Sequence, residues 1–120
     1  MRVAGFGFRS KATTAALMDA YRLAGGSADA LATVAEKADA AALRDLAHAL
    51  RLRIIAIAPE VIAAIPTPTH SPRVVTRFGT GSLAEAAALA GAGTGARLTG
   101  PRQVSGDGMA TAAIAERKEA

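Results

Sequence analysis

The chain has 120 residues, 51% of them hydrophobic, a size that suits one compact domain over residues 1–120. It contains no Cys, which excludes disulfides, thiolate metal sites and cysteine nucleophiles. The net charge of +4 is carried mainly by Arg and agrees with an anionic partner, although many cytoplasmic domains are mildly basic without one.

Two further classes of protein are not favoured. No apolar run reaches the roughly 18 residues that span a bilayer, and the N-terminus has no signal-peptide pattern. We therefore expect a cytoplasmic protein without a membrane partner. Nucleic-acid binding would need clustered basic residues with exposed aromatic side chains, and since neither is present we expect no nucleic-acid partner.

The first predicted elements are a strand over residues 3–6 and a helix over about 12–24, joined by a glycine-rich loop. In that loop Gly5 and Gly7 precede Arg9, so backbone N–H groups there could bind an anion. A dinucleotide site would need a third glycine, but position 10 is Ser10. The alternative is a tight turn that needs glycine for its backbone alone.

In the middle of the chain, residues 30–34 form a weak strand candidate. Leucines and alanine at helical spacing, from 43 to 50, predict an amphipathic helix that begins at an Asp39 cap. The apolar run over 53–57 predicts a strand buried on both faces. A short helix should then run from Pro59 to about residue 65.

The second half begins with a short helix over 72–78, for which a strand is the rival interpretation. Ser82 and Glu85 match the capping box and lead an Ala-rich helix to residue 89, so we assign Glu85 a structural role. The last strands should cover 97–99 and 109–115, with a polar loop before the second. Together these elements predict a single-domain three-layer α/β/α fold with a mixed sheet of about five strands.

Few residues suggest catalysis. Glu36, Lys37 and Asp39 follow the strand at 30–34, which is the usual place for ligands, although a solvated helix start is the alternative. His70 is the one histidine in a predicted loop. Glu36, Asp39 and His70 are therefore weak candidates for a general base. Two distant histidines and no Cys predict neither a metal site nor a cofactor.

Four segments, in order and at matching spacing, resemble the CobE/CbiG C-terminal family: residues 5–9, 33–39, 82–89 and 109–115. Together they extend over about 110 residues. Phe8 stands where that family often has Cys, and Arg102 stands where it often has Lys. The first difference excludes a cysteine role, and the second retains the charge with another geometry.

The resemblance implies a protein of cobalamin biosynthesis that binds or carries a precorrin-type intermediate in the aerobic pathway. Such rings bear acetate and propionate groups, which cations around the loops would attract. Phe8 could form part of an apolar floor, and Phe6 could do the same or belong to the core. The cations in question are Arg9, Lys11, Lys37, Arg73 and Arg102.

The full set of predicted ligand-binding residues is Gly5, Gly7, Phe8, Arg9, Ser10, Lys37, Ser71, Gly81, Ser82 and Arg102. The alternative activity is a hydrolase that opens the lactone of a cobalt-precorrin and releases a two-carbon fragment, as CbiG does. A third option is assembly, in which the helix over 83–90 docks another enzyme of the pathway or a second copy to form a homodimer.

Overall fold

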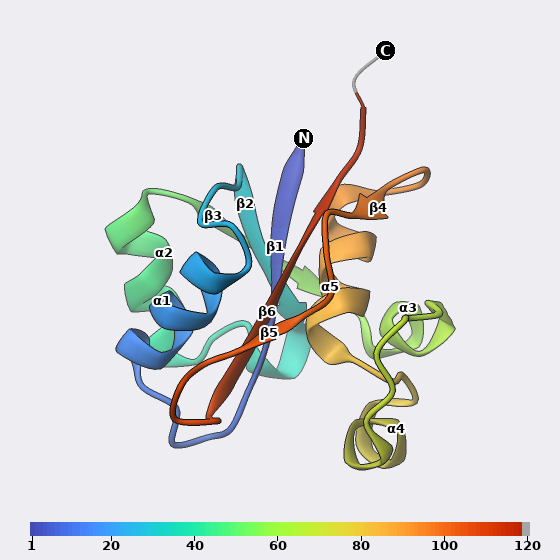
Figure 1. Cartoon of the computed structure of the whole chain (residues 1–120), viewed down its shortest axis with the longest axis horizontal. Coiled ribbons are helices and arrows are strands. Elements are labelled where there is room, and N and C mark those ends of the chain that lie inside the picture. The colour runs from blue at the N-terminus through green and yellow to red at the C-terminus, as the bar shows by residue number, and fades with distance from the viewer. Residues whose placement is uncertain (119–120) are drawn as a thin grey trace.

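The computed structural model describes residues 1–118, whose strands form one mixed sheet in the order β3-β2-β1-β6-β4, with β5 also paired to β6 (Figure 1). The strands are β1 (Arg2–Phe8), β2 (Ala30–Val34), β3 (Arg53–Ile57), β4 (Arg97–Leu98), β5 (Gln103–Val104) and β6 (Ala110–Glu116). The helices are α1 (Thr14–Leu23), α2 (Ala41–Leu50), α3 (Pro59–Ala64), α4 (Pro72–Phe78) and α5 (Leu83–Ala92), with a 3-10 turn, η1 (Ala35–Lys37), after β2.

The sheet is mixed because two kinds of connection build it. β1, β2 and β3 are parallel and are joined through α1 and α2, the crossover that parallel strands require. The last long strand, β6, returns antiparallel to β1 in the middle of the sheet. The predicted mixed sheet is confirmed. The strand that the sequence did not reveal is β5, whose two residues are too few to show any periodicity.

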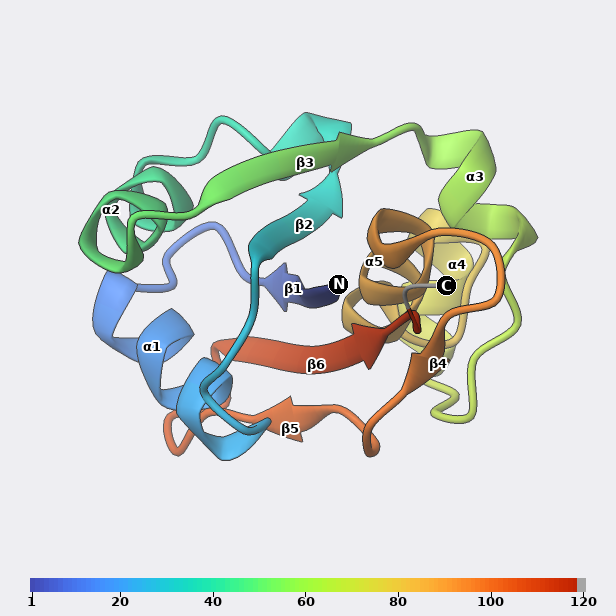
Figure 2. The same ribbon diagram turned by 90° about the horizontal axis from the view of Figure 1, so that it is seen from above.

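Helices cover both faces of the sheet, which confirms the predicted three-layer architecture (Figure 2). On one face, α1 and α2 enclose a core built around Phe6, Leu17, Leu43 and Leu46, all fully buried. On the other face, α5 packs against β1, β2 and β6 with small side chains, and α3 lies beside it. Each amphipathic element thereby buries its apolar side against the sheet.

Gly5 lies inside β1, directly beneath α5. A Cβ at this position would overlap the carbonyl oxygen of Ala84 and the amide nitrogen of Ala88, so only glycine allows the helix to approach this closely. The predicted glycine-rich loop over Gly5 and Gly7 is therefore wrong, because β1 continues to Phe8. The pattern of glycines reflects close packing between strand and helix and not a tight turn.

β3 is at the edge of the sheet, and the prediction that it is buried on both faces is wrong. Arg53 and Ala56 are exposed, Ile54 and Ile55 are half-buried, and Ile57 alone is buried. The two half-buried isoleucines pack against opposite cores, which explains the unbroken apolar run. An edge strand covered by helices on both faces thus resembles a central strand in its sequence.

The helix caps agree with the sequence in part. Thr13 caps α1, since its hydroxyl accepts a hydrogen bond from the Ala16 amide at 3.1 Å. The predicted Asp39 cap of α2 is wrong: the cap position is Ala40, which makes no side-chain hydrogen bond. Asp39 lies one residue too early, so its exposed carboxylate forms an ion pair with Arg44 at 3.6 Å instead.

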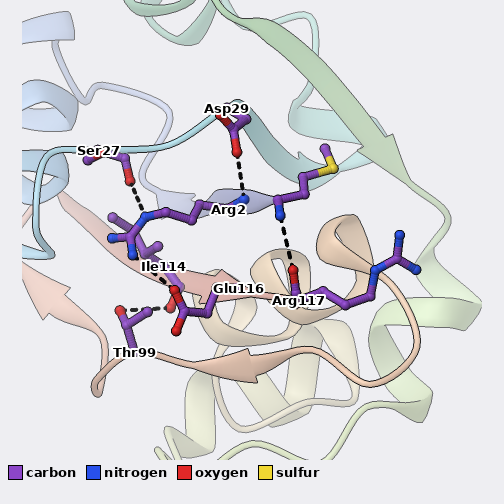
Figure 3. Close-up of polar contacts among 8 residues, drawn as sticks. Arg2, Ser27, Asp29, Thr99, Ile114, Glu116 and Arg117 are labelled. Carbon is purple, nitrogen blue, oxygen red and sulfur yellow. Dashed lines mark hydrogen bonds and ion pairs between the residues drawn. The ribbon is translucent and has the colours of Figure 1, made fainter. Parts of the chain in front are cut away.

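The two ends of the described chain meet where β1 begins and β6 ends (Figure 3). The Arg2 guanidinium forms an ion pair with Glu116 at 3.1 Å and donates to the Ser27 carbonyl at 3.0 Å. The Arg2 amide donates to Asp29 at 2.8 Å. At this end of the sheet, the charge of Arg2 is therefore paired with that of Glu116. None of the helices in residues 1–118 is long and apolar enough to cross a membrane.

Candidate functional site

A cavity of about 420 Å³ lies at the opposite end of the sheet, where β1 and β2 finish and β6 begins. That edge gathers the segments after two parallel strands, a usual position for ligand sites in α/β folds. The volume is within the range of small-molecule sites. The lining residues are Gly7, Phe8, Arg9, Ser10, Lys37, Arg73, Val74, Arg77, Phe78, Leu83, Arg102, Gly108, Met109, Ala110 and Thr111.

The cavity is cationic. Five of its lining residues are Arg or Lys, and none of the lining residues is acidic. The nearest anionic partner is Glu36 outside the lining, which forms an ion pair with Arg77 at 2.9 Å. Within residues 1–118, no carboxylate lies at ion-pair distance from Arg9, Arg73 or Arg102. Their guanidinium groups leave donor pairs for carboxylates of a ligand.

Lys37 is held against Phe8 in two ways. Its Nζ donates to the Phe8 carbonyl at 2.8 Å and lies 5.0 Å from the centre of the Phe8 ring. Burial lowers the pKa of Lys37 below its ordinary 10.5, and the Arg77 cation lowers it further, while Glu36 raises it. The ammonium group is therefore fixed in a place where an added anion would stabilise its charge.

Apolar side chains complete the cavity. Phe8 from the end of β1, Phe78 from the end of α4 and Met109 before β6 all line it. The Arg77 guanidinium lies 5.1 Å from the centre of the Phe78 ring, so a cationic and an aromatic group are in contact at the end of α4. The combination suits a ligand with an apolar framework and carboxylate substituents.

Backbone hydrogen bonds fix the β1 side of the cavity. The Arg9 amide donates to the Met109 carbonyl at 2.9 Å, and the Ala12 amide donates to the Arg9 carbonyl at 3.0 Å. The turn after β1 therefore stays attached to the beginning of β6. This attachment places Arg9 and Ser10 at the rim before α1 starts.

Glu85 on α5 joins the remaining segments. Its carboxylate is fully buried and accepts hydrogen bonds from the Thr69 amide at 2.9 Å, the Thr69 hydroxyl at 2.9 Å and the Arg102 amide at 3.0 Å. The predicted capping box is thus half correct. The Ser82 hydroxyl accepts from the Glu85 amide at 3.2 Å, but the Glu85 carboxylate binds these two segments and not the cap.

Six of the ten predicted ligand-binding residues line the cavity together: Gly7, Phe8, Arg9, Ser10, Lys37 and Arg102. Gly5 lies beneath α5, and Ser82 is the buried cap of that helix. Ser71 and Gly81 belong to a backbone contact behind α4, where the Ser71 amide donates to the Gly81 carbonyl at 2.7 Å. These four residues shape segments around the cavity without lining it.

The weak catalytic candidates do not converge. Glu36 and Asp39 are exposed and paired with arginines. His70 is exposed and lines a separate shallow hollow between α3 and the segment before α5. Within the described part of the chain, no three His, Asp or Glu side chains lie close enough to hold a metal ion.

Two other residues that were considered for ligand contact, Lys11 and Phe6, lie outside the cavity lining. Lys11 is exposed and does not line the cavity. Phe6 is fully buried in the core, where its ring stacks on Tyr21 with centroids 6.4 Å apart. Arg77 and Phe78 are lining residues that sequence reasoning missed. Arg73, Val74, Arg77 and Phe78 repeat at helical spacing on α4, which indicates that they share a face but not that this face lines a cavity.

Comparisons with known proteins agree with one another. The model of the family described as "Cobalamin synthesis G C-terminus" matches residues 2–115. The crystal structure of CobE, a protein from the cobalamin (vitamin B12) biosynthetic pathway, is 31% identical with a TM-score of 0.78, covering 96% of this chain and 89% of CobE. The crystal structure of cobalamin biosynthesis protein chiG from Agrobacterium tumefaciens str. C58 is 37% identical with a TM-score of 0.74, covering 99% of this chain and 100% of chiG.

No match was found among the curated proteins. The family match nevertheless extends over most of the chain, and both structural relatives exceed 30% identity over nearly all of it. The four segments that resembled the family in the sequence all fall within the matched region. This chain therefore belongs to the CobE/CbiG C-terminal family of cobalamin biosynthesis proteins.

Proposed function

We propose that this protein binds a precorrin-type intermediate of the aerobic cobalamin pathway by its carboxylate groups and carries it without chemical change. The observation that carries the proposal is the cationic cavity, in which five Arg and Lys side chains surround aromatic and apolar ones. A precorrin combines the matching features, since acetate and propionate groups surround a largely apolar ring. Each charge-assisted hydrogen bond contributes about 1.5 to 3 kcal/mol, less where solvent screens it.

The size of the cavity favours a carrier. A tetrapyrrole-derived ring with its side chains is larger than about 420 Å³, so the ring would be held by one edge. The other edge would remain exposed. Such partial enclosure protects one set of carboxylates and leaves the ring accessible to the next enzyme. A hydrolase would instead need a positioned base and exclusion of water at the reacting bond.

The proposed bases lend no support to hydrolysis. Glu36 neutralises Arg77, Asp39 pairs with Arg44, and His70 lies in the shallow hollow behind α4. None of the three lines the cationic cavity. The binding hypothesis needs only the cations and aromatic rings that do line it.

A spectrophotometric titration with hydrogenobyrinic acid tests the proposal. We expect micromolar or tighter binding, weakened by added salt because the contacts are ionic. The Arg9→Ala variant should bind roughly tenfold more weakly, which corresponds to about 1.4 kcal/mol. Arg53→Ala, at the exposed start of β3, changes the net charge equally and should bind like the unaltered protein.

Two results would contradict the carrier. Absence of corrinoid binding at micromolar concentrations would remove its basis. Release of acetaldehyde from a lactone-bearing cobalt-precorrin would make the protein a hydrolase, and Glu36→Gln and His70→Ala would then be compared for turnover.

A further inference from the structure

The cations of the cavity come from segments that are not part of the central sheet. Arg73 and Arg77 lie on α4, which contacts α3, stands at the periphery of the domain (Figure 1) and packs Val74 and Phe78 against the core under α5. Arg102 lies between the short strands β4 and β5. Segments of this kind need a fixed attachment if their side chains are to meet a ligand at a set distance.

Glu85 supplies an attachment for both segments. Its Oε1 accepts from the Thr69 amide at 2.9 Å, three residues before α4 begins. Its Oε2 accepts from the Arg102 amide at 3.0 Å and from the Thr69 hydroxyl at 2.9 Å. One carboxylate thus connects α5, the approach to α4 and the backbone of a lining arginine.

The chemistry of this contact requires a carboxylate. The two backbone donors approach different oxygens, and an amide side chain has one acceptor oxygen. Its negative charge is fully buried but lies in the first turn of α5, a ten-residue helix, where the N-terminal dipole favours an anion. Three donors satisfy the two oxygens, so the buried group is fully hydrogen-bonded.

We propose that Glu85 is the positioning residue of the cationic cavity. By holding the Thr69 and Arg102 backbones at a fixed spacing, it sets the distance between the cations of α4 and Arg102. It thereby determines how many of them can bind carboxylates of one ligand. This inference rests on the proposed function, because it assigns the spacing to recognition of a polycarboxylate.

The test uses Glu85→Gln, with Glu60→Gln on the exposed start of α3 as a control that removes the same charge. Hydrogen exchange of the free protein is measured first. In Glu85→Gln the Thr69 or Arg102 amide, or both, should exchange at least tenfold faster, because Gln replaces one of the two acceptor oxygens with an NH2 donor. Glu60→Gln should leave both amides unchanged.

Binding of hydrogenobyrinic acid is measured next, at a temperature where circular dichroism shows each variant fully folded. Glu85→Gln should weaken binding roughly tenfold and should also flatten its dependence on salt, since fewer cations reach the ligand. A merely structural Glu85 would lower thermal stability but leave the salt dependence of the folded protein intact. Thr69→Val, which removes only the hydroxyl donor, should act in the same direction by roughly threefold and replaces Glu85→Gln if that variant does not fold.

The outcomes of these measurements either support or overturn the positioning role of Glu85. Faster exchange with weaker, less salt-dependent binding supports the positioning role. Unchanged exchange, or faster exchange with unchanged binding, overturns it. If the unaltered protein binds no corrinoid, the proposed function fails and the positioning role with it, while the exchange data still report separately whether Glu85 holds the two segments.

Discussion

The two faces of the sheet are packed with side chains of different size. The face under α1 and α2 buries large residues, with Phe6, Leu17 and Leu46 all fully enclosed. The face under α5 buries alanines at positions 86, 87 and 88, and the helix contacts the strands almost backbone to backbone over Gly5. The first face is packed with large side chains, and the second is packed by the close approach of α5 to the strands.

This difference bears on where the cavity can form. α5 is buried nearly all round, so its first turn has Leu83 facing the cavity and Glu85 facing inward. Because α5 cannot move away from β1, the segments that Glu85 binds are attached to a rigid element. α2, by contrast, exposes one side to solvent and carries no lining residue. A site on rigid elements holds its geometry better than a site on loops alone.

The largest effect should follow from adding volume to the closely packed face. Gly5→Ala places a methyl group into the backbone of α5, which a flexible side chain cannot relieve. We expect the free energy of unfolding to fall by about 4 kcal/mol, at the upper end for overpacking. Gly100→Ala is the matched control, because nothing lies within 4 Å of a Cβ there. Urea denaturation of both variants checks this, and equal midpoints would refute the close-approach argument.

A slightly smaller effect should follow from removing volume on the other face. Leu46→Ala leaves a cavity in the core beneath α2 and should lower the free energy of unfolding by about 3 kcal/mol. Leu23→Ala removes the same atoms from a side chain that is 53% exposed and should cost less than about 1 kcal/mol. Denaturant midpoints at unchanged slope are the measurement. A loss below 1 kcal/mol for Leu46→Ala would mean that the first face is not filled by volume.

The same contrast explains how much of the fold the sequence predicted. α2 was found from leucines at helical spacing, because a helix with one solvent face shows its period. α5 has no such stripe and was located by Ser82 and its Ala content. The tight contact at Gly5 involves residues about 80 positions away, so nothing local distinguished it from a turn. The edge position of β3 likewise depends on strand order, which its own sequence does not contain.

The cavity was predictable where its residues are local to one motif. Phe8, the last residue of β1, and the next two residues, Arg9 and Ser10, were assigned together. Arg77 and Phe78 were missed, because their part in the cavity depends on where α4 packs. For Glu85 only half of the predicted capping box was correct, since Ser82 accepts from its amide while its carboxylate binds partners 16 and 17 residues away.

A modest effect should appear in the pH dependence of ligand binding in the cavity, through Lys37. Burial first, and Arg77 next, lower the pKa of Lys37 below 10.5, so the unfolded chain holds the proton more tightly than the folded one. The charged Lys37 therefore opposes folding at neutral pH, and this cost decreases as pH rises above the lowered pKa and is gone above 10.5. An anionic ligand stabilises that charge, so affinity for hydrogenobyrinic acid should fall roughly threefold over the same rise in pH.

Lys37→Arg isolates this effect, because a guanidinium stays charged throughout the range. We expect the alkaline loss of affinity to vanish in Lys37→Arg and to persist in Lys11→Arg, whose side chain is exposed outside the cavity. The measurement is the titration repeated from pH 7 to about pH 10.5. If the loss persisted in Lys37→Arg, another group would have to be its cause.

The smallest effect concerns the turn between β5 and β6, which contacts α1 and also lines the cavity. The Ser105 hydroxyl donates to Asp107 at 2.6 Å and lowers the pKa of that carboxyl below 3.8, with the Met109 amide adding to the effect. Because the folded pKa is lowered, the stabilisation is present above pH 3.8 and is lost as pH falls through the lowered value. In Ser105→Ala, an NMR titration should show the pKa of Asp107 moving towards 3.8, while Thr94→Ala, at an exposed site, leaves it in place.

The turn also contacts both α1 and the cavity. The Gly106 amide donates to Asp19 on α1 at 2.8 Å, while Gly108 and Met109 line the cavity. If the pKa of Asp107 stays low in Ser105→Ala, the backbone amides of Met109 and of Asp107 itself are enough to hold the carboxylate. If the pKa rises and hydrogenobyrinic acid binds as before, the cavity geometry does not depend on the Ser105–Asp107 hydrogen bond.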